Sequence, residues 1–220
     1  MIIACKSKLV MIGDSITDCG RARPIGEGGG ESLGRGYVSL VDALIGATNP
    51  ELGIRVVNVG SSGNTVRELK ARWTTDVLDL MPDWLSIMIG INDVWRHYDN
   101  PLRPEIHVGP DEYEATLDGL VGTTRPLVKG LVLFTPFFIE PNPTETMRAH
   151  TDQYGAAVKR VAERHNAICV DVQSAFDAVL KHRHPAAYAG DRVHPNLTGH
   201  MVIARAFLDG VGYEWYRKSR

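Results

Sequence analysis

The feature that most constrains the fold is a short apolar run, Leu9–Ile12, which ends abruptly at Gly13, Asp14 and Ser15. An uninterrupted apolar run closed by a glycine is typical of a strand buried on both faces of a parallel sheet. In open α/β sheets, ligands and catalytic groups lie just beyond the carboxyl ends of the strands. Ser15 is therefore predicted to stand at a strand end, either as a nucleophile activated by a base or as a capping residue of the turn.

Four more apolar runs follow, and segments with helical spacing of apolar residues separate them. The predicted strands are Leu9–Ile12, Ile54–Val59, Trp84–Ile89, Leu131–Phe134 and Ala167–Val172. The predicted helices cover residues 37–45, 66–77, 113–121, 147–161 and 197–208. This alternation predicts an α/β fold in which helices cover both faces of a parallel sheet, within a single domain over residues 1–220.

Two polar stretches are predicted as long loops. Arg21–Arg35 is rich in glycine and charged residues, and His97–Gly109 holds prolines and histidines. Long loops in compact domains are often binding loops or lids, but plain surface turns explain each stretch equally well.

Composition excludes several classes of protein. The 24 basic and 26 acidic residues are mixed along the chain, so neither a nucleic-acid partner nor an acidic tail is expected. The three cysteines form neither a disulfide framework nor a Cys-x-x-Cys motif. The start does not resemble a signal peptide, and no apolar window is long enough to span a membrane. A cytoplasmic protein with no membrane partner is expected.

Polar residues follow three consecutive predicted strands. Ser15 follows the first, the turn Gly60–Asn64 follows the second, and Asn92 follows the third. In a parallel sheet these three loops meet at one edge, where free backbone N–H groups near Gly63 and the amide of Asn92 could bind an oxyanion. Taken singly, Gly63 is explained as a turn glycine and Asn92 as a helix cap.

A base for Ser15 is available near the end of the chain. Asp191 and His194 are three residues apart, and Pro195 disfavours helix at His194. Across a turn the carboxylate could hold the imidazole in one tautomer, although a surface ion pair would give the same pattern. Several histidines cluster loosely here, but no metal-binding spacing is present, and neither a metal nor a cofactor is predicted.

A second serine matches a better-known pattern. Gly30, Ser32 and Gly34 fit the Gly-x-Ser-x-Gly motif of α/β-hydrolases, in which the serine must follow a buried strand. Ser32 instead follows a stretch dominated by glycine, so this match is interpreted as chance.

Taken together, these residues resemble the four sequence blocks of the SGNH (GDSL-type) hydrolases. The blocks are Gly13-Asp14-Ser15-Ile16-Thr17, Gly63 before Asn64-Thr65, Gly90-x-Asn92-Asp93 and Asp191-x-x-His194-Pro195. Within that superfamily, residues 18–24, 64–73, 87–96 and 199–208 are most similar to the intracellular bacterial acetylxylan esterases.

The resemblance implies a flavodoxin-like three-layer α/β/α sandwich with a five-stranded parallel sheet. It also implies that Ser15 is the nucleophile, His194 the base and Asp191 the orienting acid. The implied oxyanion donors are the backbone N–H groups of Ser15 and Gly63 and the side chain of Asn92.

The function expected from this resemblance is that of a serine esterase that removes acetyl groups from xylan-derived saccharides through an acyl-enzyme. Predicted substrate contacts are Asp14, Trp95, Arg96 and Tyr98, although Trp95 is equally explained by core packing. Similar esterases imply a homo-oligomer. Two alternatives stay open: a lysophospholipase or thioesterase with the same site, and a non-catalytic sugar-binding module on the same scaffold.

Overall fold

The computed structural model describes residues 1–216 and contains a five-stranded sheet in which every neighbouring pair of strands is parallel. The strands lie in the order β2-β1-β3-β4-β5. Their bounds are β1 Lys8–Gly13, β2 Arg55–Asn58, β3 Trp84–Met88, β4 Gly130–Phe134 and β5 Ile168–Val170. The predicted fold class is confirmed, and each predicted strand is present within a few residues of its expected bounds.

The register of the sheet brings the three polar loops to one edge. Leu9 of β1 pairs with Val56 of β2 on one side and with Trp84 of β3 on the other. Because these strands are parallel, the chain leaves β1, β2 and β3 at the same side of the sheet. The residues of β3 and β4 are all buried, as expected of strands covered on both faces.

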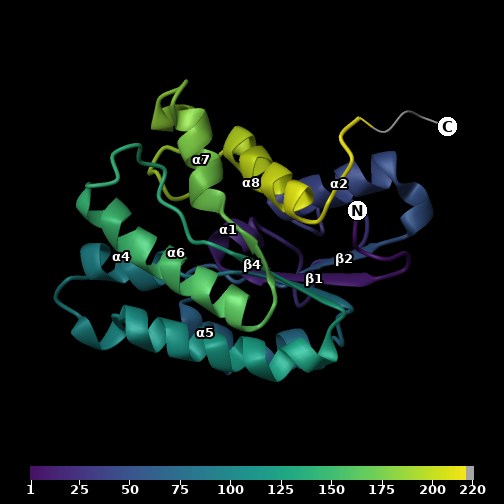
Figure 1. Ribbon diagram of the computed structural model, residues 1–220, viewed down its shortest axis with the longest axis horizontal. Coiled ribbons are helices and arrows are strands. Elements are labelled where there is room, and N and C mark those ends of the chain that lie inside the picture. Colours follow the sequence, from purple (N-terminus) through teal and green to yellow (C-terminus); the bar gives the residue numbers. More distant parts are fainter. Residues whose placement is uncertain (217–220) are drawn as a thin grey trace.

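Helices cover both faces of the sheet and make a three-layer sandwich. Contacts join α2, α7 and α8 on one face and α3, α4, α5 and α6 on the other, and Figure 1 shows α2 and α8 on the opposite side of the strands from α5. The helix bounds are α1 Ser15–Asp18, α2 Tyr37–Thr48, α3 Val66–Ala71, α4 Ile91–Asp99, α5 Pro110–Thr124, α6 Thr146–Arg164, α7 Val172–Leu180 and α8 Leu197–Gly210.

Aromatic side chains fill the core on each side of the sheet. Phe134 of β4 stacks on Phe207 of α8, with ring centroids 5.8 Å apart, and also contacts Tyr37 of α2. Across the other face, the rings of Tyr113 and Tyr154 join α5 to α6 at 5.0 Å. Large buried rings of this kind contribute much of the apolar area that holds helix layers on a sheet.

Two predicted boundaries are wrong. Residues 97–99 belong to α4 rather than to a loop, because the helix continues to Asp99 and stops where Pro101 disfavours helical backbone at Asn100. The second error concerns the predicted strand Ala167–Val172, which ends at Val170, and the helix α7 that follows it, which the sequence pattern does not predict. Its N-cap Asp171 accepts a hydrogen bond from the backbone of Ser174 and ends the short strand β5 early.

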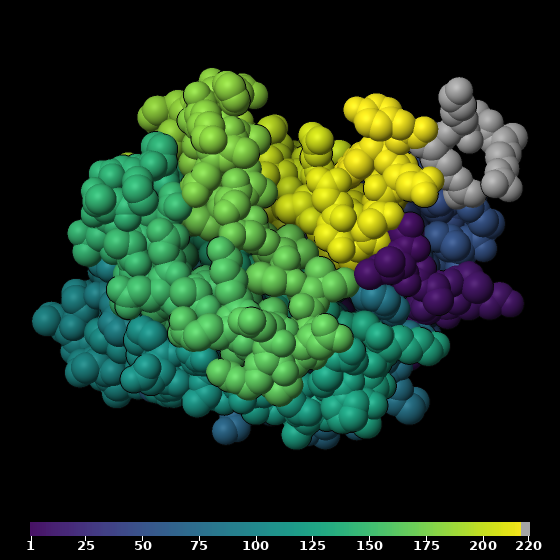
Figure 2. All heavy atoms as spheres, in the orientation of Figure 1, coloured from purple at the N-terminus to yellow at the C-terminus, as the bar shows by residue number. Residues whose placement is uncertain are grey.

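The two ends of the described chain lie side by side. The backbone N–H of Ile2 donates to the carbonyl of Val211, just after α8, at 2.9 Å, and Figure 2 shows the first residues against the last part of α8. No helix within residues 1–216 combines the length and the apolar character that crossing a membrane requires.

Candidate active site

The nucleophile candidate Ser15 stands at the first position of α1, two residues after Gly13 ends β1. The turn is tight, because a Cβ at Gly13 would lie 2.3 Å from the carbonyl oxygen of Met88. Asp14 caps α1 by accepting a hydrogen bond from the backbone of Ile16 at 3.0 Å. Ser15 itself is partly exposed, so its hydroxyl is open to a substrate.

Asp14 has a capping role in place of the predicted substrate contact. Only 1% of its surface is exposed, so its carboxyl group faces the interior. Burial raises the pKa of Asp14 to about 7, although the hydrogen bond from Ile16 and the nearby His194 and Arg72 side chains act in the opposite direction. Asp14 is next to Ser15 in sequence, but its side chain caps α1 and does not face the open side of the site.

Ser15, His194 and Asp191 form one chain of hydrogen bonds. The Oγ of Ser15 lies 3.0 Å from Nε2 of His194, and Nδ1 of His194 lies 2.7 Å from Oδ2 of Asp191. When Nδ1–H donates to the carboxylate, the lone pair on Nε2 is free to accept the serine proton. The structure therefore brings together the three residues that the sequence proposed as nucleophile, base and orienting acid.

Asp191 is held in its charged form. Its Oδ1 accepts hydrogen bonds from the backbone N–H groups of Val193, at 2.9 Å, and His194, at 2.7 Å. Burial alone would raise the pKa of Asp191, but the hydrogen bonds from the His194 side chain and from the two backbone groups lower it below its usual range. A charged carboxylate at this place favours a proton on Nδ1.

The loop that carries Asp191 and His194 is anchored to the segment after β4. The backbone N–H of Ile139 donates to the carbonyl of Arg192 at 2.9 Å, and the Arg192 guanidinium pairs with Glu140 at 2.6 Å. Trp95 of α4 packs against the imidazole of His194, with ring centroids 5.5 Å apart. These contacts restrict the positions that the imidazole can take in front of Ser15.

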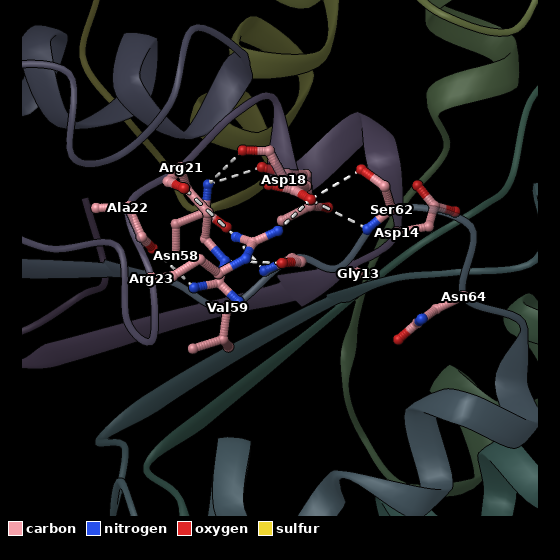
Figure 3. Close-up of polar contacts among 12 residues, drawn as sticks. Gly13, Asp14, Asp18, Arg21, Ala22, Arg23, Asn58, Val59, Ser62 and Asn64 are labelled. Atoms are coloured by element: carbon pink, nitrogen blue, oxygen red, sulfur yellow. Dashed lines mark hydrogen bonds and ion pairs between the residues drawn. The ribbon is translucent and has the colours of Figure 1, made fainter.

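Two of the three predicted oxyanion donors, Gly63 and Asn92, lie on segments that are hydrogen-bonded to each other. Asn92, at the start of α4, donates a side-chain hydrogen bond to the carbonyl of Asn64 at 3.0 Å, next to Gly63. Gly63 has φ +80°, a backbone conformation that disfavours any other residue at this turn. On the other side of the turn, Asp18 of α1 accepts hydrogen bonds from the backbone and hydroxyl of Ser62 (Figure 3). The turn is thus bonded to both α1 and α4.

Comparison with known proteins identifies the family. Residues 11–202 match the model of the GDSL-like lipase/acylhydrolase family. The chain belongs to the GDSL-like lipase/acylhydrolase family.

Acetylxylan esterases from Geobacillus stearothermophilus are similar to this chain over nearly its whole length. An acetylxylan esterase from Geobacillus stearothermophilus is 61% identical over 217 residues, which is 99% of each chain. The crystal structure of Axe2, an acetylxylan esterase from the same organism, is 61% identical, covers 100% of both chains and has a TM-score of 0.98. A crystal structure described as that of a catalytic mutant of Axe2, S15A, matches at 60% identity with the same coverage and TM-score.

One further buried group, for which the sequence predicts no role, lies next to Asn92 in the sequence block Gly90-x-Asn92-Asp93. Asp93 is fully buried, and its Oδ1 accepts a hydrogen bond from the backbone of Val66, at the start of α3, at 2.9 Å. Its second oxygen has no hydrogen-bond partner among residues 1–216, and burial raises the pKa of Asp93 to about 7. The sequence feature that points to Asp93 is its position next to Asn92, just after the end of a strand.

Arg96, a predicted substrate contact, lies beside the turn Gly60–Asn64, which is called the oxyanion turn below. Its guanidinium pairs with Asp99 and lies 3.4 Å from the side-chain oxygen of Asn92. A cavity of about 280 Å³ adjoins this turn. Its lining includes Gly63, Arg67, Glu68, Arg96, Glu105 and Ile106.

The side chain of Tyr98, another predicted substrate contact, points toward α6. Its hydroxyl donates to the carbonyl of Thr146 in α6 at 3.2 Å, and its ring packs against His150. The structure therefore joins Tyr98 to α6, and it shows no contact of Tyr98 with the triad. The misplacement follows from the unrecognised last turn of α4, which carries Tyr98 as part of a helix.

The serine of the second motif is hydrogen-bonded within its own loop. The hydroxyl of Ser32 donates to the carbonyl of Gly29 at 2.9 Å, within the loop that precedes α2. His200, one of the loosely clustered histidines, is buried and bonded to the backbone of Tyr37 and the thiol of Cys19, and burial lowers its pKa to about 4. Within residues 1–216 there is no group of three or more His, Cys, Asp or Glu side chains arranged to hold a metal ion.

Proposed function

We propose that this protein is a serine esterase that removes acetyl groups from xylan-derived saccharides. The observation that carries the proposal is the hydrogen-bonded series Ser15–His194–Asp191 in a chain that is 61% identical to an acetylxylan esterase over nearly its whole length. An intact nucleophile, base and orienting acid argue against a non-catalytic sugar-binding module, because such a module has no need of them.

In the first half of the reaction, Ser15 attacks the acetyl carbonyl while Nε2 of His194 accepts the hydroxyl proton. The carbonyl oxygen becomes an oxyanion that the backbone N–H groups of Ser15 and Gly63 and the second amide N–H of Asn92 can stabilise. His194 then donates its proton to the departing sugar oxygen. An acetyl-enzyme on Ser15 is left.

In the second half, a water molecule replaces the sugar. Nε2 of His194 accepts a proton from the water as it attacks the acetyl carbon, and the same three donors stabilise the second oxyanion. Collapse of this intermediate returns the proton to Ser15 and releases acetate. The Asp191 carboxylate stabilises the imidazolium in both halves and keeps the proton on Nδ1 when the ring is neutral.

The surroundings of the site suit a saccharide better than a long acyl chain. Arg96 and Glu105 supply hydrogen-bond donors and acceptors to the cavity beside Gly63, and Trp95 offers a ring next to His194. Sugar hydroxyls both donate and accept hydrogen bonds, so a mixed polar lining satisfies them. A hydrocarbon chain in the same cavity would remove charged groups from water without pairing them.

Substrate preference tests this proposal. We expect the kcat/KM for 4-nitrophenyl esters to be highest for acetate and to fall by at least about tenfold for octanoate, since added CH₂ groups gain about 0.8 kcal/mol each only where apolar wall receives them. Acetate release from acetylated xylo-oligosaccharides, followed by NMR, should accompany that preference. A kcat/KM that rises with chain length would favour the lysophospholipase or thioesterase alternative and contradict the acetylesterase.

Two properties inferred from the sequence stay predictions: assembly as a homo-oligomer and a cytoplasmic location. Sedimentation of the purified protein measures the first, and cell fractionation measures the second.

A further inference from the structure

Arg72, the residue that follows α3, donates hydrogen bonds to three separate stretches of chain. Its Nε lies 2.6 Å from Oδ1 of Asn64, Nη1 lies 2.6 Å from the carbonyl of Val59, and Nη2 lies 2.7 Å from the carbonyl of Gly13. Nη1 also pairs with Asp76, one turn further along, at 2.8 Å. Only 16% of the Arg72 side chain is exposed, so these bonds are largely shielded from water.

Each of the three acceptors belongs to the catalytic edge of the sheet. Gly13 ends β1 two residues before Ser15, Val59 directly follows β2, and Asn64 is next to Gly63 in the oxyanion turn (Figure 3 labels all three). The backbone carbonyl of Asn64 in turn accepts the hydrogen bond from Asn92. Arg72 therefore bonds directly to the end of β1, which precedes Ser15, and to the turn that carries Gly63, and it reaches Asn92 through Asn64.

The chemistry of this contact set requires an arginine. A guanidinium presents five N–H donors in a rigid plane, so it can bond several acceptors at fixed angles, and hydrogen bonds from a charged donor are stronger than neutral ones. A lysine ammonium carries the same charge on a single flexible nitrogen and cannot span the three acceptors. The positions of the Gly13 and Asn64 groups relative to each other thus depend on the guanidinium.

We propose that Arg72 is a positioning residue that holds the oxyanion turn in register with the nucleophile Ser15. This inference rests on one part of the proposed function, the role of Ser15 as the nucleophile. Arg72 acts through Asn64 and the end of β1 and does not need to touch the substrate. Displacement of the turn by a fraction of an ångström would weaken donors to the transition state more than it would weaken substrate binding.

The test compares Arg72→Lys with Arg125→Lys in the hydrolysis of 4-nitrophenyl acetate. Arg125 is a matched control, because its guanidinium also donates to two backbone carbonyls, those of His165 and Val128, before the start of β4. We expect Arg72→Lys to lower kcat by roughly 10–100-fold with KM within about twofold, the scale of a misplaced donor. Arg125→Lys should lower the unfolding midpoint without changing kcat.

Two further measurements separate positioning from stability. Millimolar guanidinium should restore part of the kcat of Arg72→Ala and leave that of Arg125→Ala unchanged. Asn64→Ala removes one guanidinium contact and keeps the backbone, so it should lower kcat even if the Arg72 variants fail to fold. If Arg72 and Asn64 act on the same turn, the variant that carries both Arg72→Lys and Asn64→Ala will lose less kcat than the two single losses predict together.

A kcat for Arg72→Lys and Asn64→Ala within about threefold of the parent would overturn the positioning role. The positioning role would also be overturned if the activity lost in the Arg72 variants equalled the fraction of protein that is unfolded and guanidinium restored none of it. Either result would leave the proposed esterase activity of the parent chain intact.

Discussion

Asp191→Asn is expected to lower kcat by roughly 10⁴-fold while leaving the fold intact, as the loss of the correct imidazole tautomer does in other serine hydrolases. Oδ1 of Asp191 accepts two backbone hydrogen bonds, and Oδ2 accepts the proton on Nδ1 of His194. An asparagine that keeps the backbone bonds must place its NH₂ group toward Nδ1. Nδ1 would then become an acceptor, Nε2 would carry the proton, and His194 could no longer accept one from Ser15.

Asp118→Asn is the matched control for this substitution. Asp118 bonds His165 at 2.8 Å and also pairs with Arg164, in a similar Asp–His pair between α5 and the end of α6. Its replacement should leave kcat unchanged. A loss below about tenfold in Asp191→Asn would show that Asp191 is a surface partner of His194 and that another group orients the base.

Asn92→Ala is expected to lower kcat by roughly 10²–10³-fold with little change in KM, the scale for the loss of one oxyanion donor. Asn92 is buried, with 4% of its surface exposed, and one N–H of its amide is committed to Asn64. The second N–H is the donor available to the oxyanion. An alanine removes this donor and also frees the carbonyl of Asn64, so both effects act on the transition state.

Steady-state kinetics on 4-nitrophenyl acetate measure this effect. Asn100→Ala provides the control, because Asn100 is a half-buried asparagine at the other end of α4 whose side chain donates to the adjacent Asp99. Near-parental kcat in Asn92→Ala would remove Asn92 from the mechanism. A rise in KM with unchanged kcat would instead indicate that Asn92 binds the substrate and the transition state equally.

The sheet and the triad were predictable because each depends on local pattern and on one topological rule. Apolar runs of five strands indicated a parallel sheet, and a parallel sheet places Ser15, Gly63 and Asn92 at one edge. Asp191 and His194 needed only a three-residue spacing and a proline to be interpreted as a pair. Only the structure provides the distances, which are 3.0 Å from Ser15 Oγ to His194 Nε2 and 2.7 Å from His194 Nδ1 to Asp191 Oδ2.

Side-chain direction was not predictable in the same way. Asp14 adjoins Ser15 in sequence, but its carboxyl group turns inward to cap α1, and no pattern distinguishes the two directions. Tyr98 adjoins the site in sequence, but the last turn of α4 carries its side chain toward α6. The contacts of Arg72 could not be predicted, because its acceptors lie 8, 13 and 59 residues away in sequence. Two of these acceptors are backbone carbonyls, which every residue has.

The central claim is that Ser15 is the nucleophile and that His194 activates it. A fluorophosphonate reacts with an activated serine because a base removes the proton and nearby donors stabilise the adduct, whereas an ordinary serine has neither aid. Peptide mapping after labelling should find one modified residue, Ser15. The label should be lost in Ser15→Ala and His194→Ala and retained in Ser32→Ala. An adduct on Ser32, or labelling of Ser15 that persists in His194→Ala, would contradict the account.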